Sequence, residues 1–266
     1  PEQQYAIVVD TNRSRLYLYR NDGGQPRYVA DYYISSGKNG AQKTREGDQK
    51  TPIGVYHVTA SLPQDKLPDF YGSGAFPINY PNDWDKRHGR SGFGIWLHGT
   101  PSDTFSRPPR ASDGCVALSN NDLDTVAKYV QVGQTPVIIS EGVEWVNIND
   151  WSEERDAFLG QFEQWRTDWE SLDTERYLQN YSRKFNSGGQ NFASFSRAKR
   201  MVNANKDWIK LSLSDLAVFR NPGREGVVVV TFDQDYRSSN LSNTMKKRQY
   251  WMREGNRWRI VFEGAA

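Results

Sequence analysis

The chain has a single cysteine, three histidines and no long apolar run, and each scarcity narrows what it can be. One cysteine cannot form an intramolecular disulfide, so the cysteine content gives no sign of the redox compartment. Because no run of about 18 apolar residues occurs, we expect no membrane-spanning helix. The histidines and Cys115 show neither a zinc-finger nor a His-x-x-x-His spacing, so we expect no metal and no other cofactor.

The charges are also balanced, with 34 basic and 32 acidic residues. A division near residue 142 leaves 15 basic and 15 acidic residues before it, and 19 and 17 after it. Nucleic-acid binding normally needs a concentrated positive face, so we expect no nucleic-acid partner. The hydrophobic fraction of 36% and the charged fraction of 25% are typical of a folded globular protein, and 266 residues suffice for two domains.

The first half of the chain reads as short strands and turns. Ala6–Asp10 and Arg15–Arg20 flank a turn-rich segment, which predicts a hairpin. Residues 62–94 are rich in proline, glycine and asparagine and predict a long loop that covers a site. Further strands are expected at Tyr28–Ser36, Gly54–Ser61, Ile95–His98 and Val137–Ser140, and a helix at Asn121–Val130 behind Ser119 and Asn120.

The second half changes character and predicts an α+β unit. Phe158, Phe162, Trp165 and Trp169 recur at helical spacing and would share one face of a helix. We expect three helices packed on a twisted antiparallel sheet. The helices are Glu153–Trp169, Thr174–Phe185 and Phe192–Asn205, and the strands are Ile209–Phe219, Val227–Ser238, Thr244–Arg253 and Trp258–Phe262. We place the domains at residues 1–142 and 143–266.

Two segments carry candidate chemistry, Ile95–Thr100 and Ala111–Leu118. Side chains alternate along a strand, so Trp96 and His98 would point away from the core into a cleft. A thiol such as that of Cys115 becomes a nucleophile when an imidazole takes its proton, and nearby backbone N–H groups could hold the oxyanion. Considered alone, a lone cysteine is more often an inert buried residue, and a lone histidine a structural one.

The pattern around these residues resembles the L,D-transpeptidase, or YkuD-type, catalytic domain over residues 5–141. The matching motifs are His98-Gly99 and, after 13 intervening residues, Ser112-Asp113-Gly114-Cys115. Thr51-Pro52-Ile53-Gly54-Val55-Tyr56 and the Asn-rich helix start after Leu118 resemble two further motifs of the family. The resemblance implies a mostly-β catalytic domain whose substrates are peptidoglycan stem peptides.

The resemblance also implies residue roles. Cys115 would attack the carbonyl between the third-position diamino acid and D-alanine, His98 would be the base, and the Gly99 carbonyl would orient the imidazole. The chain departs from the pattern at Asp113, where a histidine is usual, and at Ala117, where an arginine or asparagine is usual. Arg107 or Arg110 could supply the missing cation, although either could equally be a solvated surface arginine. The residues expected at the substrate are Ser112, Asp113, Gly114, Tyr80, Trp96 and Arg110.

Two groups of aromatic residues leave alternatives open. Tyr80 and Trp84 could form a lid over the cleft or simply pack the loop onto the core. The second half resembles the nuclear transport factor 2-like cone, and such cones often hold a pocket, which here could take a protein or glycan ligand. The four aromatic residues that could line such a pocket, or more commonly form the core, are Trp165, Tyr177, Tyr181 and Trp251.

The two halves together look like the cell-shape-determining L,D-carboxypeptidases of helical bacteria. The acyl group would pass to water in a carboxypeptidase, or to an amine in a transpeptidase. Alternatives are a non-catalytic wall-binding module, and an enzyme that attaches or releases a wall-linked protein. We expect a periplasmic location, although a chain beginning Pro1-Glu2-Gln3 shows no signal peptide.

Overall fold

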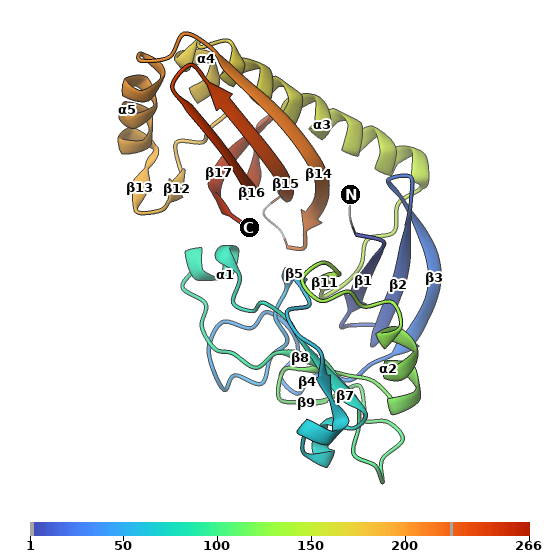
Figure 1. The fold of residues 1–266 in the computed structure, drawn as a ribbon. Helices are drawn as coiled ribbons and strands as arrows, with labels where there is room; N and C mark the ends of the chain where they lie inside the picture. The colour runs from blue at the N-terminus through green and yellow to red at the C-terminus, as the bar shows by residue number, and fades with distance from the viewer. Residues whose placement is uncertain (1–2, 224–225) are drawn as a thin grey trace. The chain divides into compact units, whose positions relative to one another are not determined.

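The computed structural model describes residues 3–223 and 226–266, which form two compact units (Figure 1). The first unit runs to Glu144, and the second from Trp145 to Ala266. This division lies close to the expected boundary between residues 142 and 143. Within the described residues, no helix is both long and apolar enough to cross a membrane.

The first unit is built around a five-stranded sheet of order β3-β2-β1-β11-β5. Its strands are β1 (Tyr5–Asp10), β2 (Arg15–Asp22), β3 (Gln25–Tyr33), β5 (Gly54–His57) and β11 (Pro136–Ser140). The expected hairpin is confirmed, because β1 and β2 pair in antiparallel register. Alternate residues Ile7, Val9, Leu16 and Leu18 are fully buried, so one face of the sheet covers the core.

A second sheet of order β10-β8-β7-β6 carries the candidate site. Its strands are β6 (Leu62–Pro63), β7 (Gly74–Pro77), β8 (Trp96–His98) and β10 (Val116–Ala117), while β4 (Ser36–Gly37) and β9 (Arg110–Ser112) form a separate two-stranded sheet. Helix α2 (Asn120–Ala127) follows β10, and the Ser119 side chain accepts a hydrogen bond from the Asp122 N–H to cap it. The helix predicted at Asn121–Val130 is therefore present and ends about one turn earlier.

The prediction of a single long loop over residues 62–94 was wrong. The segment holds β6, β7, two single-turn 3-10 helices (Gln64–Lys66 and Asp69–Tyr71) and helix α1 (Asp83–Arg87). Reciprocal hydrogen bonds between Asn82 and Asp85 form a capping box at the start of α1. The pairing of β6 with β7, and of β7 with β8, explains how a segment rich in turn residues becomes ordered structure.

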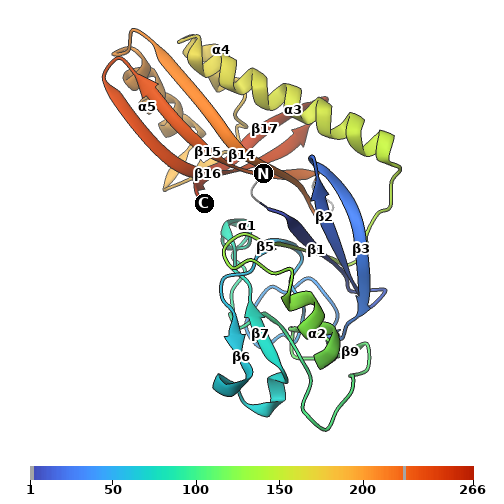
Figure 2. The same cartoon turned by 45° about the vertical axis from the view of Figure 1, so that its right-hand side comes forward.

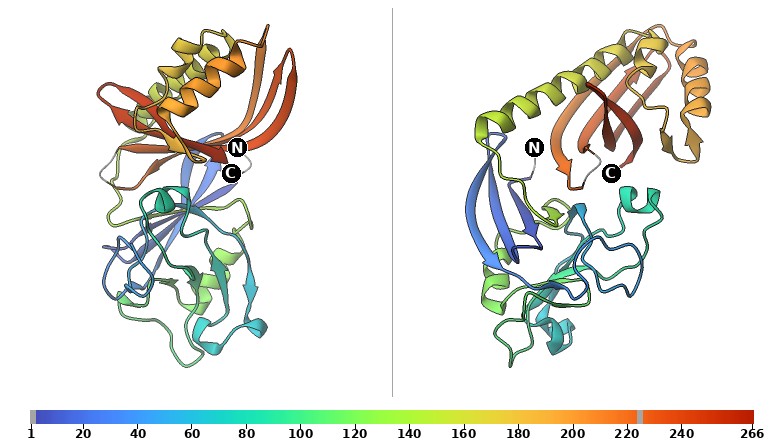
Figure 3. Two further views of the ribbon diagram at one scale, coloured as in Figure 1. Left: turned by 90° about the vertical axis from the view of Figure 1, so that its left-hand side faces the viewer. Right: turned by 180° about the vertical axis from the view of Figure 1, so that it is seen from behind.

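The second unit has the expected α+β plan, with helices on an antiparallel sheet of order β14-β15-β16-β17. The helices are α3 (Ile148–Glu170), α4 (Thr174–Leu178) and α5 (Phe192–Asn203), and a small hairpin joins β12 (Asn186–Ser187) to β13 (Gln190–Asn191). The sheet strands are β14 (Ile209–Asn221), β15 (Val227–Ser238), β16 (Leu241–Glu254) and β17 (Arg257–Ala265). Figure 2 and Figure 3 show α3 lying along this sheet.

One helix of the second unit is shorter than predicted. The sequence predicts helix to Phe185, but α4 ends at Leu178. The following backbone pairs with β17 instead: the Ile260 N–H donates to the Asn180 carbonyl, and the Ser182 N–H donates to the Ile260 carbonyl. These long-range bonds satisfy the same groups that a continued helix would use.

The aromatic face of α3 packs on the sheet as its spacing predicts. Phe158 contacts Trp251 with ring centroids 5.6 Å apart, and Phe162 contacts Phe232 at 5.1 Å. Both pairs meet edge to face, the arrangement that aromatic quadrupoles favour. The core of the second unit is therefore predominantly aromatic where α3 meets the sheet.

Candidate active site

Two short parallel strands, β8 and β10, hold the segments that carry the candidate cysteine and histidine side by side. Leu97 pairs with Val116, and both side chains are buried in the core. Because side chains alternate along a strand, Trp96 and His98 lie on the opposite face. Cys115 directly precedes β10, and continuation of the same register would put its side chain on the face of Trp96 and His98. The strand pairing thus brings the chain segments of the thiol and the imidazole next to each other.

The Cys115 thiol is half-buried and hydrogen-bonded to backbone. Its Sγ donates to the carbonyl of Gly94 at 3.2 Å. Burial raises the pKa of the thiol to about 11, although the Trp96 N–H and the positive charge of Arg107 act in the opposite direction. At neutral pH the thiol is therefore protonated, and it needs a base to become a thiolate.

The His98 imidazole is fully buried and held by the next residue in the chain. Its Nδ1 lies 2.6 Å from the carbonyl oxygen of Gly99. A carbonyl can only accept, so Nδ1 carries the hydrogen and Nε2 is left with a free lone pair. Burial lowers the pKa of His98 to about 4, against the hydrogen bond to Gly99, which raises it. The ring is neutral at pH 7 and can accept a proton at Nε2.

The Gly99 backbone is itself fixed by a network around Asn120. The Gly99 N–H donates to the Tyr71 carbonyl at 2.9 Å. The Asn120 Oδ1 accepts from the Ser73 and Thr100 N–H groups, while its Nδ2 donates to the Thr100 carbonyl. A Cβ at position 99 would lie 2.1 Å from Asn120 Oδ1, so only glycine allows this approach. The sequence marks Asn120 only as part of a helix start and gives no sign of this second role.

Side-chain hydrogen bonds from Ser112 and Thr51 hold the turn before the cysteine. Ser112 Oγ donates to the Cys115 carbonyl at 2.6 Å and accepts from the Gly114 N–H at 3.1 Å. Thr51 Oγ1 donates to the Gly114 carbonyl at 2.9 Å. Gly114 has a φ of 132°, and a Cβ there would lie 2.8 Å from the Lys50 carbonyl oxygen. The Gly114 N–H, one of the backbone groups near Cys115 that could hold an oxyanion, is therefore already engaged.

Asp113, at the position where the family usually has histidine, is tied to the preceding loop. Its Oδ1 accepts from Lys38 Nζ and from Gln49 Nε2, each at 2.9 Å. The hydrogen bond from Lys38 holds the pKa of the carboxyl below its usual range. Asp113 is exposed and ionised at neutral pH, and its charge raises the pKa of Cys115. The residue therefore orders the rim of the site and does not activate the thiol.

The two candidate arginines, Arg107 and Arg110, differ clearly in what they contact. The positive charge of Arg107 lowers the pKa of both His98 and Cys115, and its guanidinium lies 4.5 Å from the centre of the Phe70 ring. Arg110 instead directs its guanidinium to the side-chain oxygen of Asn12 at 3.4 Å. Arg107, and not Arg110, is thus the cation whose field reaches the candidate pair.

Two aromatic rings, Phe70 and Tyr71, lie against the imidazole, and Trp96 packs on Tyr71. The Tyr71 ring meets the His98 ring edge to face at 5.2 Å and lies 4.9 Å from the Trp96 ring. The Phe70 ring lies 6.0 Å from His98 and is half exposed. Trp96 was expected here, whereas Phe70 and Tyr71 were missed. Their only sequence signal is an aromatic pair between Pro68 and Gly72 in a turn-rich segment.

The remaining candidates lie in the cores of their units. Tyr80 is 6% exposed and its hydroxyl donates to the Ser91 carbonyl, while Trp84 is 3% exposed. Their packing role, one of the two alternatives, is the one that the structure favours over a lid. The four aromatics proposed to line a cone pocket are also buried core residues: Trp165, Tyr177, Tyr181 and Trp251.

Two family models match the chain. Residues 4–139 match the L,D-transpeptidase catalytic domain. Residues 157–264 match the Cds6 C-terminal NTF2-like domain. The two matches follow the order of the two units and together cover most of the chain.

Relatives and solved structures agree with these matches. The chain is 30% identical over 125 residues to Escherichia coli YafK, provisionally named an L,D-transpeptidase. This stretch is 47% of the chain and 46% of YafK, so the chain spans about half the length of the curated relative it matches. Bdellovibrio bacteriovorus Bd1075 is 31% identical, with a TM-score of 0.86 over 99% of this chain and 92% of that one. The helical cell shape determining protein Pgp2 of Campylobacter jejuni is 27% identical, with a TM-score of 0.83 over 98% and 91%.

Proposed function

Because this chain belongs to the L,D-transpeptidase family, we propose that it is a peptidoglycan-modifying cysteine acyl-transfer enzyme. Its substrate is the tetrapeptide stem, and the bond cleaved joins the third-position diamino acid to D-alanine. Cys115 is the nucleophile, His98 the general base and acid, and Gly99 the group that orients the imidazole. The acyl group passes to water, which makes the enzyme an L,D-carboxypeptidase.

The first half-reaction follows from the protonation states of the pair. His98 Nε2 takes the thiol proton while Cys115 Sγ attacks the carbonyl carbon of the diamino acid. The negative charge that develops on the carbonyl oxygen is stabilised by the Cys115 N–H. His98 then returns the proton to the nitrogen of the departing D-alanine, the C–N bond breaks, and a thioester remains on Cys115.

The second half-reaction reverses these roles. His98 Nε2 takes a proton from water, whose oxygen attacks the thioester carbonyl. The C–S bond breaks, the thiolate regains its proton from His98, and a tripeptide with a free carboxylate leaves. The two-domain plan, which resembles that of the cell-shape L,D-carboxypeptidases, supports water as the acceptor. An amine would follow the same steps and give a transpeptidase.

The observation that carries the proposal is the hydrogen bond from His98 Nδ1 to the Gly99 carbonyl, with His98 on β8 and Cys115 directly before β10, the strand that pairs with β8. With the hydrogen on Nδ1, the Nε2 lone pair is free to accept a proton. The Cys115 thiol is protonated at neutral pH and needs such a base to become a thiolate. Arg107 supports the substrate class, because its positive charge beside the pair suits the carboxylates of a stem peptide.

The test is incubation of the full chain with a purified disaccharide-tetrapeptide, with and without a D-amino acid as acceptor, followed by mass spectrometry. We expect the tripeptide in both cases, loss of one D-alanine, and no product from Cys115→Ala. Exchange products or crosslinked dimers would instead assign the transpeptidase reaction.

Two other functions remain as outcomes when this assay is combined with measurements of thiol acylation, of binding to sacculi and of turnover of a protein-linked muropeptide. An unchanged tetrapeptide, no thiol adduct with a carbapenem by intact mass, and retained binding to sacculi would identify a wall-binding module. Turnover of a protein-linked muropeptide alone would identify an enzyme that attaches or releases a wall-linked protein.

We propose the periplasm as the location, because stem peptides lie there. Fractionation of cells that express the full-length protein tests this.

A further inference from the structure

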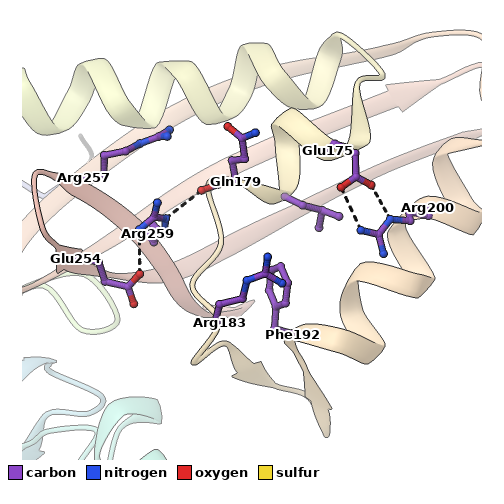
Figure 4. A pocket seen from close by; sticks show the side chains of 9 residues that line it. Glu175, Gln179, Arg183, Phe192, Arg200, Glu254, Arg257 and Arg259 are labelled. Carbon is purple, nitrogen blue, oxygen red and sulfur yellow. Dashed lines mark hydrogen bonds and ion pairs between the residues drawn. The ribbon is translucent and has the colours of Figure 1, made fainter.

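A pocket in the second unit, remote in sequence from Cys115, is lined by four arginines. It lies between α4, α5 and the turn from β16 to β17 (Figure 4), and its volume is about 450 Å³. The arginines are Arg183, Arg200, Arg257 and Arg259, and we call this the arginine pocket. The volume is that of a cavity for a small organic ligand.

Only part of this positive charge is neutralised by the protein. Arg200 pairs with Glu175 at 2.7 Å, and Arg259 pairs with Glu254 at 3.2 Å. Among the lining residues, all of which the structure describes, Arg183 and Arg257 make no ion pair (Figure 4). Four arginines and two glutamates leave a formal charge of +2 in the pocket.

The existing ion pair at the rim does not close the pocket to a ligand. The side chains of Arg200 and Glu175 are 50% and 67% exposed. Exposed ion pairs contribute little to stability, since water solvates both partners when they separate. A ligand carboxylate can therefore displace Glu175 from Arg200 at small cost.

The pocket also has an apolar wall. The Arg183 guanidinium lies over the Phe192 ring at 4.4 Å from its centre, and Leu178 lines the same cavity. Stacking on an aromatic ring holds the guanidinium plane in place, so its donors are oriented before a ligand arrives. An inorganic ion would leave Phe192 and Leu178 without a contact, whereas an organic anion covers them.

We propose that the arginine pocket binds an organic dianion that carries two carboxylates, such as an acidic peptide segment. Two carboxylates match the formal charge of the pocket, and each can accept the paired N–H donors of a guanidinium. The carbon skeleton between the carboxylates lies against Phe192 and Leu178. The pocket forms within the second unit alone, so this proposal does not depend on the chemistry at Cys115.

The experiment measures binding of the dipeptide Glu-Glu, N-acetylated and C-terminally amidated so that it carries two carboxylates, to the full chain by titration calorimetry at low ionic strength. The matched neutral probe is Gln-Gln with the same two end groups, and inorganic phosphate is the third. We expect the acidic dipeptide to bind more tightly than both. Arg183→Gln with Arg257→Gln should weaken its binding by about tenfold or more, since charge-assisted bonds are lost.

The matched control removes two exposed arginines elsewhere in the same unit, Arg220→Gln with Arg237→Gln. It removes the same charge, and we expect a change below about twofold. Arg183→Lys with Arg257→Lys keeps the charge without the planar fork, and we expect an intermediate loss. Equal weakening by the pocket pair and the control pair would overturn the proposal. So would equal affinity for phosphate or for Gln-Gln, or no binding of Glu-Glu to the unmodified chain.

Discussion

His98 Nδ1 lies 2.6 Å from the carbonyl oxygen of Gly99, the next residue in the chain. A backbone carbonyl fixes the tautomer and the ring direction of this imidazole, as a carboxylate does in a Ser-His-Asp triad. It adds no negative charge beside the buried ring, and burial lowers the pKa of His98 to about 4. The hydrogen bond to Gly99 by itself raises the pKa of His98, but burial outweighs it, so the ring is held in position in its neutral form.

The depressed pKa of His98 predicts that acid destabilises the protein in a defined window. The unfolded chain binds a proton at His98 below its ordinary pKa of 6.5, whereas the folded chain does so only near 4. The free energy of unfolding should therefore fall as the pH drops from 6.5 to about 4, by roughly 3 kcal/mol from this group.

Urea unfolding of the unmodified protein and of His98→Gln at several pH values measures this effect. The glutamine side chain does not titrate. The unfolding free energy of the unmodified protein minus that of His98→Gln should therefore decrease as the pH falls. A difference that stays constant from pH 6.5 to 4 would show that His98 is not held neutral by the fold.

Asn120 is predicted to act on the rate as a positioning residue. Asn120→Ala leaves the Ser73 and Thr100 N–H groups without an acceptor and should lower the free energy of unfolding by about 1–3 kcal/mol. The backbone around Gly99 would then be held less firmly, and with it the carbonyl that orients His98. We therefore expect kcat to fall by a larger factor than the factor by which KM changes.

Asn120→Asp keeps the acceptor for both N–H groups and loses only the bond to the Thr100 carbonyl, so an intermediate kcat is expected. Steady-state kinetics and thermal unfolding of both variants separate the two effects. A rise in KM at unchanged kcat would mean that Asn120 acts on substrate binding and not on His98.

Arg107 is predicted to bind a substrate carboxylate, and Arg110 serves as its matched control. Arg107→Gln should raise KM for the disaccharide-tetrapeptide by about tenfold, the cost of one charge-assisted contact. Arg110 contacts Asn12, so Arg110→Gln should change KM by less than about twofold. Similar effects of the two substitutions on KM would contradict the assignment.

Substitution of Trp165 tests whether this residue belongs to the packed core of the second unit. The side chain is fully buried between Phe162 and Trp169. Trp165→Ala should lower the free energy of unfolding by about 3–5 kcal/mol, as large aromatic truncations do. Chemical denaturation measures it. Near-unchanged stability would indicate that Trp165 faces a ligand cavity instead.

The features that follow from the periodicity of side chains within one strand or helix could be predicted from the sequence. Alternation along Ile95–His98 predicted Leu97 in the core, where the structure has it, whereas His98, expected to face a cleft, is also only 1% exposed. The helical spacing of the α3 aromatics likewise placed Phe158 and Phe162 on the buried face. Such periods depend only on backbone geometry within one element.

The parts set by distant partners could not be predicted. Strands β6 and β7 are stabilised by pairing, so the composition of residues 62–94 gives no sign of them. Arg110 turns toward Asn12, which lies far from it in the sequence, and nothing local distinguishes it from Arg107. Phe70 and Tyr71 reach His98 only through the fold of the turn that carries them.

The pairing of β8 with β10 has a consequence for how such an enzyme can diversify. The proposed base lies on β8 and the proposed nucleophile directly precedes β10, while residues 101–106 run outside that sheet. Lengthening a surface loop adds little closure entropy, so this loop can grow or change composition while Gly99 and Arg107 stay in place. We therefore expect changes in this loop to alter selectivity more than reactivity. Loop exchange at residues 101–106 offers a route to new acyl acceptors on an unaltered reactive pair.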